Sequence, residues 1–434
     1  MCYIIIENFE QLSFIDPYKC HYSKNNALLE NISDYSNYLI IDLFDTFASI
    51  CYCDFYNKRN EDKFNVVNLN IGVTTPEKFD MIKFDLEKLI SFMTNGEIWK
   101  ISFYKKQKSP LIATTKTQMS IKKNINSIAL LSGGLDALAG AFQELNNNTL
   151  FITFETNKTE SNKAKQSFEM LSKLNENCYH VRIPKLQFEK KKQTTQRTRT
   201  LLFIGSALIY ADFYEIDTIK IYENGIMSLN PTFAFRRRVT HTIHPRTLYI
   251  INDIFKKLGV NIKVINPFNF MTKAEVINLI PKECSNIISN TKTCSKMPGS
   301  KPFQNRKNSG ICQCGMCTAC VLRQISILNS NKMNFDDNYI LPSNIASLSE
   351  IEKYENDYGV DNEKAREISH YKYVEKKSLL QYYNEFKNKI LSGDIYRYLE
   401  LSPILFENSD YKEKYNIMLS KFAKEIEKYL NSQI

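Results

Sequence analysis

The sequence predicts an α/β protein built on a doubly wound parallel sheet, with an N-terminal α+β domain and a helical C-terminal tail. Three observations predict this fold class. Strand-like and helix-like segments alternate from residue 125 to about residue 330, which is typical of parallel sheets covered by helices. A glycine pair follows the first of these strands, and closely spaced cysteines end the alternating region. Both chemical motifs of the chain therefore fall within the predicted sheet domain.

The predicted domains follow from these patterns. In the N-terminal domain, residues 1–122, apolar alternation predicts strands at 66–73 and 98–104, with a helix at 79–93. In the sheet domain, residues 123–335, short apolar strands are expected at 127–131, 150–154, 179–183, 218–222 and 261–265. The helices of that domain are expected at 136–145, 160–174, 200–214, 247–258 and 272–279. Residues 336–434 have a helical pattern and carry no motif with an assignable chemistry.

The composition is that of an ordinary globular protein. The 434 residues are 43% hydrophobic and 24% charged, which excludes a disordered chain, a collagen-like fibre and a small disulfide scaffold. The most apolar stretch, 38–53, is interrupted by Asp42 and Asp45, so no spanning helix of about 18 apolar residues is expected. No signal peptide is expected either, and we predict a cytoplasmic protein. The net charge of +10 is compatible with a nucleic-acid partner but does not predict one.

The glycine pair belongs to the strongest motif of the chain. The turn comprises Leu131, Ser132, Gly133, Gly134, Leu135, Asp136 and Ala137. Glycines let backbone N–H groups approach an anion closely, and the N-terminus of the following helix stabilises a phosphate. Ser132 can donate a hydroxyl hydrogen bond, and Asp136 can fix the loop or hold Mg²⁺ beside the phosphates. The pattern is neither a Walker loop nor a dinucleotide-binding glycine motif, and a plain strand–turn–helix connection is the alternative.

The cysteines near the end of the sheet domain form two overlapping Cys-x-x-Cys steps, at Cys314, Cys317 and Cys320. Without a predicted secretion signal, this spacing indicates metal ligation, and four thiolates close a tetrahedral zinc shell. Cys294 is the expected fourth ligand, because Cys312 is so close to Cys314 that both binding one ion would strain the loop. Cys312 and Cys284 remain competitors, and a redox pair or a cluster without metal are the alternatives.

The glycine turn resembles the Ser-Gly-Gly-x-Asp-Ser signature of the PP-loop ATP pyrophosphatases, except that Ala137 replaces the last serine. Together with the cysteine motif, it resembles the QueC family of 7-cyano-7-deazaguanine synthases. That family also has a Thr-Lys-x-Glu sequence after a proline, matched here at 272–275, and a cysteine motif that ends in arginine, matched by Arg323. The resemblance covers about residues 125–330 and implies a PP-loop fold of the HUP, or adenine nucleotide alpha hydrolase-like, type.

Several segments resemble more closely the QueC-like proteins of bacterial antiphage defence, such as QatC of the Qat system and its counterparts in CBASS operons. The matching segments lie at 99–103, 197–202, 223–225, 229–231 and 242–246. The resemblance implies an ATP-dependent ligase that adenylates 7-carboxy-7-deazaguanine and passes it to an amine, with ATP, Mg²⁺ and Zn²⁺ as cofactors. The amine is expected on a partner protein from the same operon, for example at its N-terminus. The alternative is ammonia, as in the synthesis of 7-cyano-7-deazaguanine (preQ0).

The side chains expected to act on the phosphates are Asp136, Lys273 and Arg199. Lys273 follows a strand and opens a helix, so its ammonium can reach the phosphates; the alternative is a solvated lysine in a first helical turn. Arg199 begins another helix and is the candidate for the α-phosphate, with Arg197 as a weaker one. The arginine run at 236–238 is of a kind that is most often a solvated loop.

The side chains expected to contact the deazaguanine are Glu223, Asn224, His244 and Arg246. Glu223 and Asn224 follow a strand, at the edge where open α/β sheets bind ligands, and an ordinary turn is the alternative. The spacing of His241 and His244 alone would suit a metal. No carboxylate or cysteine lies beside them in the sequence, so substrate binding or loop shaping together with Arg246 is the preferred interpretation.

Two rival functions stay open. A tRNA-modifying PP-loop enzyme that delivers sulfur fits the basic charge and the cysteine motif, but the sequence at 272–275 favours the QueC family and no tRNA-binding domain is recognisable. A nucleotide-binding scaffold that has lost turnover is favoured only by Ala137.

Overall fold

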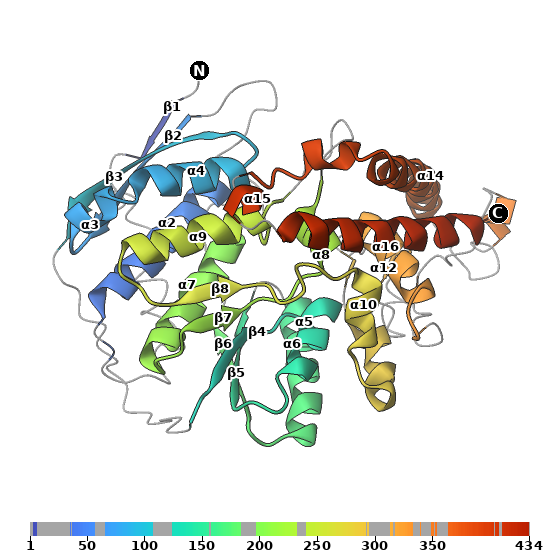
Figure 1. The fold of residues 1–434 in the computed structure, drawn as a ribbon, viewed down its shortest axis with the longest axis horizontal. Helices are drawn as coiled ribbons and strands as arrows, with labels where there is room; N and C mark the ends of the chain where they lie inside the picture. The colour runs from blue at the N-terminus through green and yellow to red at the C-terminus, as the bar shows by residue number, and fades with distance from the viewer. Residues whose placement is uncertain are drawn as a thin grey trace.

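A five-stranded parallel sheet occupies the middle of the molecule (Figure 1). The computed structural model describes residues 3–6, 35, 37–56, 66–106, 124–155, 158–183, 197–231, 240–291, 293–294, 313–315, 317–332, 339, 349–350, 352–353, 363–402, 404–407 and 410–433. The strands of the central sheet are β4 (Ser127–Leu130), β5 (Thr149–Phe154), β6 (Cys178–Ile183), β7 (Thr218–Lys220) and β8 (Lys263–Ile265). They lie in the order β6-β5-β4-β7-β8 and every pair is parallel. The predicted parallel sheet is thus confirmed.

Helices cover both faces of this sheet. They are α5 (Leu135–Gln143), α6 (Lys158–Leu174), α7 (Arg199–Phe213), α9 (Pro245–Lys257) and α10 (Lys273–Asn278). Successive strand residues point to opposite faces. Ile128 and Leu150 accordingly pack in one core with α7 and α9, whereas Ala129 and Phe151 pack in another with α5 and α10. The sheet is therefore doubly wound, as predicted.

The N-terminal region forms a second, three-stranded sheet. Its strands β1 (Tyr3–Ile6), β2 (Val66–Val73) and β3 (Ile98–Lys105) pair in parallel. Helix α2 (Tyr38–Tyr56) connects the first two strands, and α3 (Pro76–Asp80) and α4 (Lys83–Met93) connect the last two. The expected α+β arrangement is wrong here, because neighbouring parallel strands need a crossover connection and helices provide it. The helix expected at 79–93 is divided in two.

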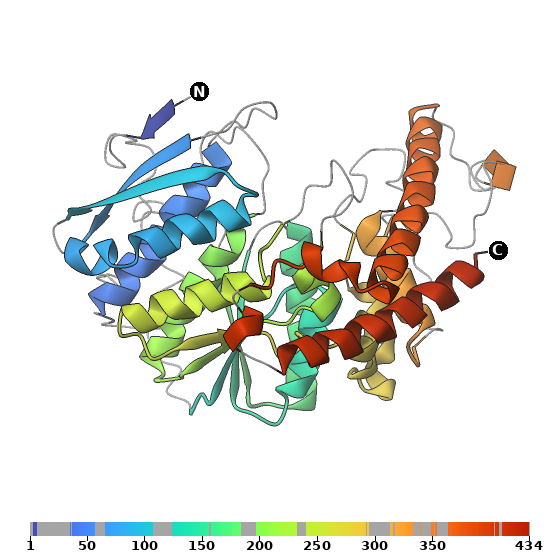
Figure 2. The same cartoon turned by 45° about the horizontal axis from the view of Figure 1, so that its top comes forward.

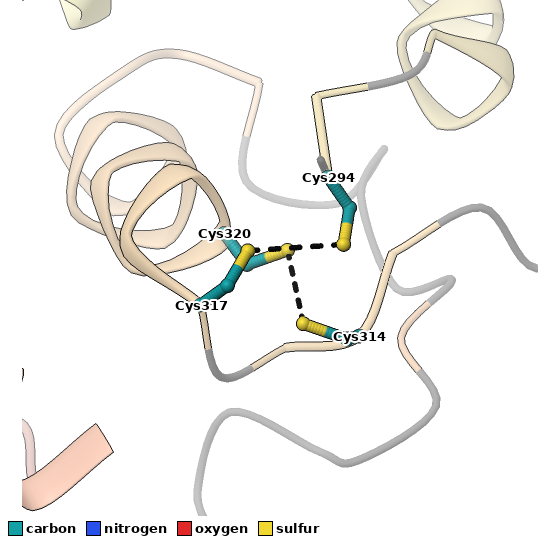
Figure 3. A group of neighbouring side chains, drawn as sticks. All are labelled: Cys294, Cys314, Cys317 and Cys320. Carbon is teal, nitrogen blue, oxygen red and sulfur yellow. Dashed lines mark hydrogen bonds between the residues drawn. The ribbon is translucent and has the colours of Figure 1, made fainter. Parts of the chain in front are cut away.

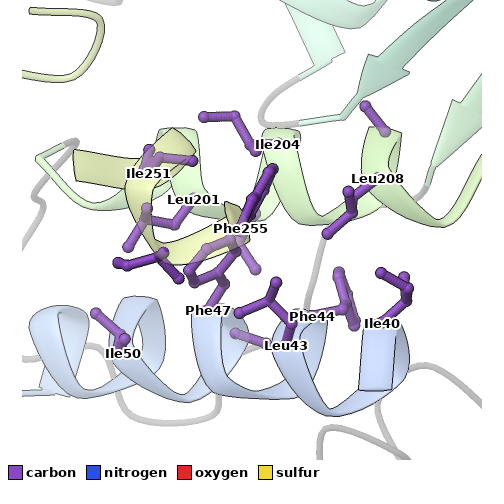
Figure 4. Close-up of a cluster of buried hydrophobic side chains, with 14 of the residues drawn as sticks. Ile40, Leu43, Phe44, Phe47, Ile50, Leu201, Ile204, Leu208, Ile251 and Phe255 are labelled. Atoms are coloured by element: carbon purple, nitrogen blue, oxygen red, sulfur yellow. The ribbon is translucent and has the colours of Figure 1, made fainter. Parts of the chain in front are cut away.

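Helix α2 is the apolar stretch that was weighed above as a membrane span. It packs along α7, where Phe44 and Phe47 meet side chains such as Leu208 (Figure 4). The two acids within the stretch are buried and bonded: Lys106 lies 3.0 Å from Asp42 and 2.7 Å from Asp45. One core therefore runs from the N-terminal sheet into the central sheet. None of the helices in the described ranges is long and apolar enough to cross a membrane.

The C-terminal part of the chain is helical, as predicted. It contains α12 (Thr318–Leu328), α14 (Glu363–Leu391), α15 (Ile404–Glu407) and α16 (Tyr411–Asn431). Helix α16 crosses the ends of α12 and α14 and shares their apolar core (Figure 2). The domain boundaries expected after residues 122 and 335 lie outside the described residues and stay predictions.

Candidate functional site

The central sheet has a crevice where its strand order reverses, between β4 and β7. From β4 the chain first moves outward through β5 and β6, then returns to the other side for β7 and β8. Open α/β sheets bind ligands beyond the carboxyl ends of the strands at such a point. The glycine turn follows β4, and Glu223 and Asn224 follow β7. The structure thus brings these two groups of predicted residues to one edge of the sheet.

The glycine turn is anchored to the sheet at its first residue. Leu131 N donates to Ile152 O at 2.9 Å, and Leu131 O accepts from Thr153 Oγ1 at 2.6 Å. Ser132 is exposed, and its Oγ accepts a hydrogen bond from Gly134 N at 3.2 Å. Gly134 is the N-cap of α5, and no side chain among the described residues caps this helix. The N–H groups of its first turn are therefore available to an anion.

Asp136 and Lys273 form a buried ion pair behind the turn. Lys273 Nζ donates to Asp136 Oδ1 at 2.5 Å, and the two side chains are 5% and 6% exposed. Asn224 donates to Asp136 Oδ2 twice, from Nδ2 at 2.6 Å and from its backbone N at 3.1 Å. Lys273 is consequently not the solvated first-turn lysine that was the alternative. Asp136 of α5, Asn224 at the N-cap of α8 (Gly225–Leu229) and Lys273 of α10, all predicted site residues, are thus bonded in one cluster.

Glu223 adds a second carboxyl group to this cluster. Burial, the charge of Asp136 and a hydrogen bond to it raise the pKa of Glu223 well above its ordinary value. Burial acts in the same direction on Asp136, but the charge of Lys273 and hydrogen bonds from Glu223, Lys273 and Asn224 outweigh it and lower the Asp136 pKa. Glu223 therefore holds a proton more tightly than Asp136 does, and the negative charge of the pair is favoured on Asp136.

Two adjoining cavities open at the crevice. The larger, of about 300 Å³, is lined by Ser132, Gly133, Arg199 and Glu223 among others. The smaller, of about 170 Å³, is lined by Gly134, Asp136, Lys273 and Thr293 among others. Residues common to both walls are Ser132, Ala137, Tyr222, Glu223 and Met227. The larger cavity lies at the lower end of the range for ligand pockets, about 300–1,000 Å³.

Arg199 reaches the larger cavity from the first turn of α7. Its guanidinium lies 5.4 Å from the ring centre of Phe203, which lines the same cavity. Arg197 points elsewhere: it donates to Thr94 O at 2.5 Å and lies 3.4 Å from Glu97 Oε1. Arg197 therefore ties α7 to the N-terminal region, and the arginine run at 236–238 lies outside the described residues.

His244 and Arg246 are not brought to the two cavities. His244 caps α9: its Nδ1 accepts from Arg246 N at 3.0 Å, and its Nε2 donates to Leu399 O at 2.9 Å. Burial lowers the pKa of His244 to about 3, so the ring is neutral. Arg246 lies over the ring of Phe92 and lines a separate cavity of about 740 Å³ beside α4 and β3. His241 lines that cavity too, with Nδ1 3.0 Å from Phe92 O.

The four cysteines predicted as metal ligands form one buried cluster (Figure 3). Their sulfur atoms all lie within 4.8 Å of one another. Cys294 Sγ is 3.7 Å from Cys317 Sγ, and Cys314 Sγ is 3.8 Å from Cys320 Sγ. Four sulfurs on a tetrahedral zinc ion, each bonded at about 2.3 Å, lie about 3.8 Å apart. The cluster can therefore hold a metal ion such as zinc, and Cys294 completes it; Cys312 lies outside the described residues.

Polar contacts from neighbouring residues hold this cluster in shape. Gln313 Oε1 accepts from Cys294 N at 3.0 Å. Gly315, with φ of +84°, makes the turn between the first two cysteines of the motif in a conformation that favours glycine. Arg323, fully buried, donates to Thr291 Oγ1 at 2.8 Å and to Thr293 Oγ1 at 2.9 Å. The arginine that ends the motif thus clamps the segment that carries Cys294, and Thr293 on that segment lines the smaller cavity.

Two residues behind Lys273, Thr272 and Glu425, were not among the predicted site residues. Thr272 is the N-cap of α10, in a capping box with Glu275. Thr272 Oγ1 also donates to Glu425 Oε1 of α16 at 2.5 Å. The Thr-x-x-Glu spacing signals the capping box. No sequence pattern signals a contact with a residue 153 positions away.

No protein-family model matches this chain, and a search of curated proteins gives no significant match.

Proposed function

We propose that the protein is a cytoplasmic ATP-dependent ligase with a PP-loop fold, which adenylates the carboxylate of a 7-deazaguanine and passes the acyl group to an amine. One observation carries the proposal. An uncapped helix N-terminus behind a glycine turn opens onto two adjoining cavities, with Arg199 at one and Lys273 at the other. Donors and positive charge converging on one crevice suit a polyphosphate.

The reaction needs little covalent chemistry from the protein. A carboxylate oxygen of the substrate attacks the α-phosphorus of ATP, the bond to the bridging oxygen breaks, and pyrophosphate leaves with the electron pair. The amine then attacks the acyl carbon, loses a proton, and AMP leaves. Holding both reactants in line and stabilising the developing charge are the tasks left to the protein.

Each residue of the site has a place in this scheme. The N–H groups at the start of α5 and the Ser132 hydroxyl would bind pyrophosphate oxygens. Arg199 would bind the α-phosphate from the larger cavity, and Glu223 and Asn224 would contact the deazaguanine. Lys273 would exchange its bond to Asp136 for one to a phosphate oxygen. The pair would thus hold the ammonium in position until the nucleotide arrives.

The cysteine cluster and Asp136 are the proposed sites for Zn²⁺ and Mg²⁺, and they differ in how readily they could accept the ion. Four buried thiols at tetrahedral spacing leave no open position, so a zinc ion there would stabilise the fold beside Thr293. Asp136 suits Mg²⁺ by chemistry, but both its oxygens already accept hydrogen bonds. Mg²⁺ would have to arrive with the nucleotide and displace Lys273 or Asn224 from the carboxylate.

A nucleotide-binding scaffold is the second candidate, and Ala137 favours it. This residue lines both cavities where the related signature has a serine. A lost hydrogen bond to a charged group is worth about 1.5–3 kcal/mol, which weakens a phosphate site without abolishing it. For the ligase, the proposed acceptor is an amine of a partner protein, and ammonia is the alternative. A tRNA-modifying enzyme that delivers sulfur is a separate rival function.

The release of AMP and pyrophosphate from ATP tests the proposal. The ligase requires release that depends on both Mg²⁺ and 7-carboxy-7-deazaguanine. ATP binding without release would support the scaffold, and cleavage stimulated by tRNA instead of the acid would support the thiolation enzyme. Adding ammonia or candidate partner proteins to the acid-dependent reaction then identifies the acceptor.

A further inference from the structure

Helix α16 reaches the site from the far end of the chain (Figure 1). Glu425 Oε1 accepts a hydrogen bond from Thr272 Oγ1 at 2.5 Å, and the same hydroxyl accepts from Glu275 N at 3.3 Å. Thr272 is the N-cap of α10, and Lys273 is the first residue of that helix. One side chain of α16 therefore holds the residue that fixes the start of the Lys273 helix.

Two more contacts join α16 to the same edge of the sheet. Asn269 Nδ2 donates to Tyr415 Oη at 2.7 Å. Met418 lies against Gly225, so closely that a Cβ built on the glycine would be 2.2 Å from Met418 Sδ and 2.4 Å from Asn269 O. Gly225 follows Asn224, which bonds to Asp136. Helix α16 thus touches the segments that present both partners of Asp136.

Glu425 is an unusual residue for a packing contact. It is 7% exposed, and its Oε2 has no hydrogen-bond partner among the described residues. Burying a carboxyl group with an unpaired oxygen is unfavourable, and an apolar side chain would pack between helices at lower cost. The bond to Thr272 is the contact that an apolar side chain could not make.

We propose that Glu425 is a positioning residue, which acts through Thr272 to hold Lys273 against Asp136, and that α16 is thereby a working part of the site. The inference rests on the proposed function for its role in catalysis. The positioning itself is a property of the folded chain, and it can be measured without turnover.

The first test measures the accessibility of Lys273 in the full-length chain. Acetic anhydride acylates free lysine amines, and mass spectrometry of the digested protein gives the rate at each lysine. The Lys273 side chain is 5% exposed and ion-paired, so it should react slowly. In Glu425→Ala the rate at Lys273 should rise about tenfold, as expected when one buried hydrogen bond is lost. Glu427→Ala, an exposed glutamate on the same helix, is the matched control and should leave the rate unchanged.

The conservative variants separate positioning from simple stability. Glu425→Gln and Thr272→Ser keep the hydrogen bond, so both should retain slow labelling of Lys273. A Glu425→Ala protein that loses thermal stability but labels Lys273 at the wild-type rate would overturn the proposal. So would Glu425→Gln if it labelled as fast as Glu425→Ala.

The second test uses the reaction. Glu425→Ala should raise the KM for ATP about tenfold, with Glu425→Gln restoring it. The pH dependence of this KM should distinguish wild type from Glu425→Gln. In wild type the KM should change near neutrality, where the Glu425 carboxyl titrates, whereas in Glu425→Gln it should not. The charged groups that act on Glu425 are Glu275 of α10 and Lys421 of α16, so neither residue is substituted in these variants. A wild-type protein that never cleaves ATP would end the proposed function, while the labelling result would still decide the positioning role.

Discussion

Lys273 Nζ lies 2.5 Å from Asp136 Oδ1, and this buried pair joins the first turns of two helices whose paired residues are 137 positions apart in the sequence. Asn224 occupies the other carboxylate oxygen. The pair explains why two separate motifs, the glycine turn and the sequence at 272–275, belong to one site. Lys273 is held there out of contact with solvent, in place to exchange the carboxylate for another anion.

Replacing Lys273 tests this pair. Lys273→Met should leave Asp136 buried without its countercharge and lower the free energy of unfolding by about 3–5 kcal/mol. The double variant Asp136→Asn with Lys273→Met should recover most of that loss but release no AMP. Urea unfolding followed by fluorescence gives the free energies. Lys421→Met removes an exposed ion pair with Glu275 and should change stability by only about 0–1 kcal/mol. A Lys273→Met protein as stable as this control would show that the pair is not buried in solution.

Metal analysis tests the cysteine cluster. We expect one zinc ion per chain, which Cys294→Ser should retain poorly. Cys284→Ser, outside the cluster, should keep it. Gln313→Ala removes the bond to Cys294 N and should weaken metal binding about 10- to 100-fold. Titration with a chromogenic chelator measures each affinity. Zinc lost from Cys312→Ser but kept by Cys294→Ser would reverse the assignment of the fourth ligand.

The pH dependence of stability tests the environment of Glu425. Burial, together with the charge of Glu275, raises the pKa of Glu425 from 4.5 to about 7. Between these values the native carboxyl keeps a proton that the unfolded chain loses, so this group makes the protein less stable as pH rises through that window. A shift of about 2.5 units corresponds to about 3 kcal/mol. Glu425→Gln should therefore gain stability relative to wild type from pH 4.5 to 7, whereas Glu427→Gln should follow wild type throughout. Parallel curves for wild type and Glu425→Gln would contradict the buried carboxyl.

A gain-of-function variant tests the glycine turn. Ala137 is 5% exposed and lines both cavities. Ala137→Ser introduces the hydroxyl that the PP-loop signature has at this position and should tighten ATP binding by about 1.5 kcal/mol, roughly tenfold. Isothermal titration calorimetry measures the change. Ala139 lies two residues further along α5, is fully buried and lines neither cavity. Ala139→Ser is therefore a control that should not tighten binding. Unchanged affinity in Ala137→Ser would place the phosphates elsewhere.

The sequence predicted local features better than distant ones. The alternation of strand-like and helix-like segments predicted the central sheet, because apolar runs and glycine turns are patterns of residues that are neighbours in the sequence. Cysteine spacing identified three of four thiols, and the strain expected at Cys312 favoured Cys294 as the fourth. The parallel pairing of the N-terminal strands was missed, because helix α2 looked like an isolated apolar stretch. Only its packing against α7 explains that stretch.

Contacts between distant segments account for most of what the sequence did not predict. His244 and Arg246 looked like substrate ligands next to a proline, but His244 caps α9 and Arg246 turns toward Phe92. Glu425 looked like one of many glutamates in a charged helix. Its role depends on where α16 docks, which the apolar residues of that helix decide together with α12 and α14.

Release of AMP and pyrophosphate from ATP and Mg²⁺, with and without 7-carboxy-7-deazaguanine, tests the central claim most directly. The ligase predicts release that the acid stimulates strongly in wild type and that Lys273→Met abolishes. ATP that binds but is not cleaved, with or without the acid, would contradict the ligase and leave a nucleotide-binding scaffold.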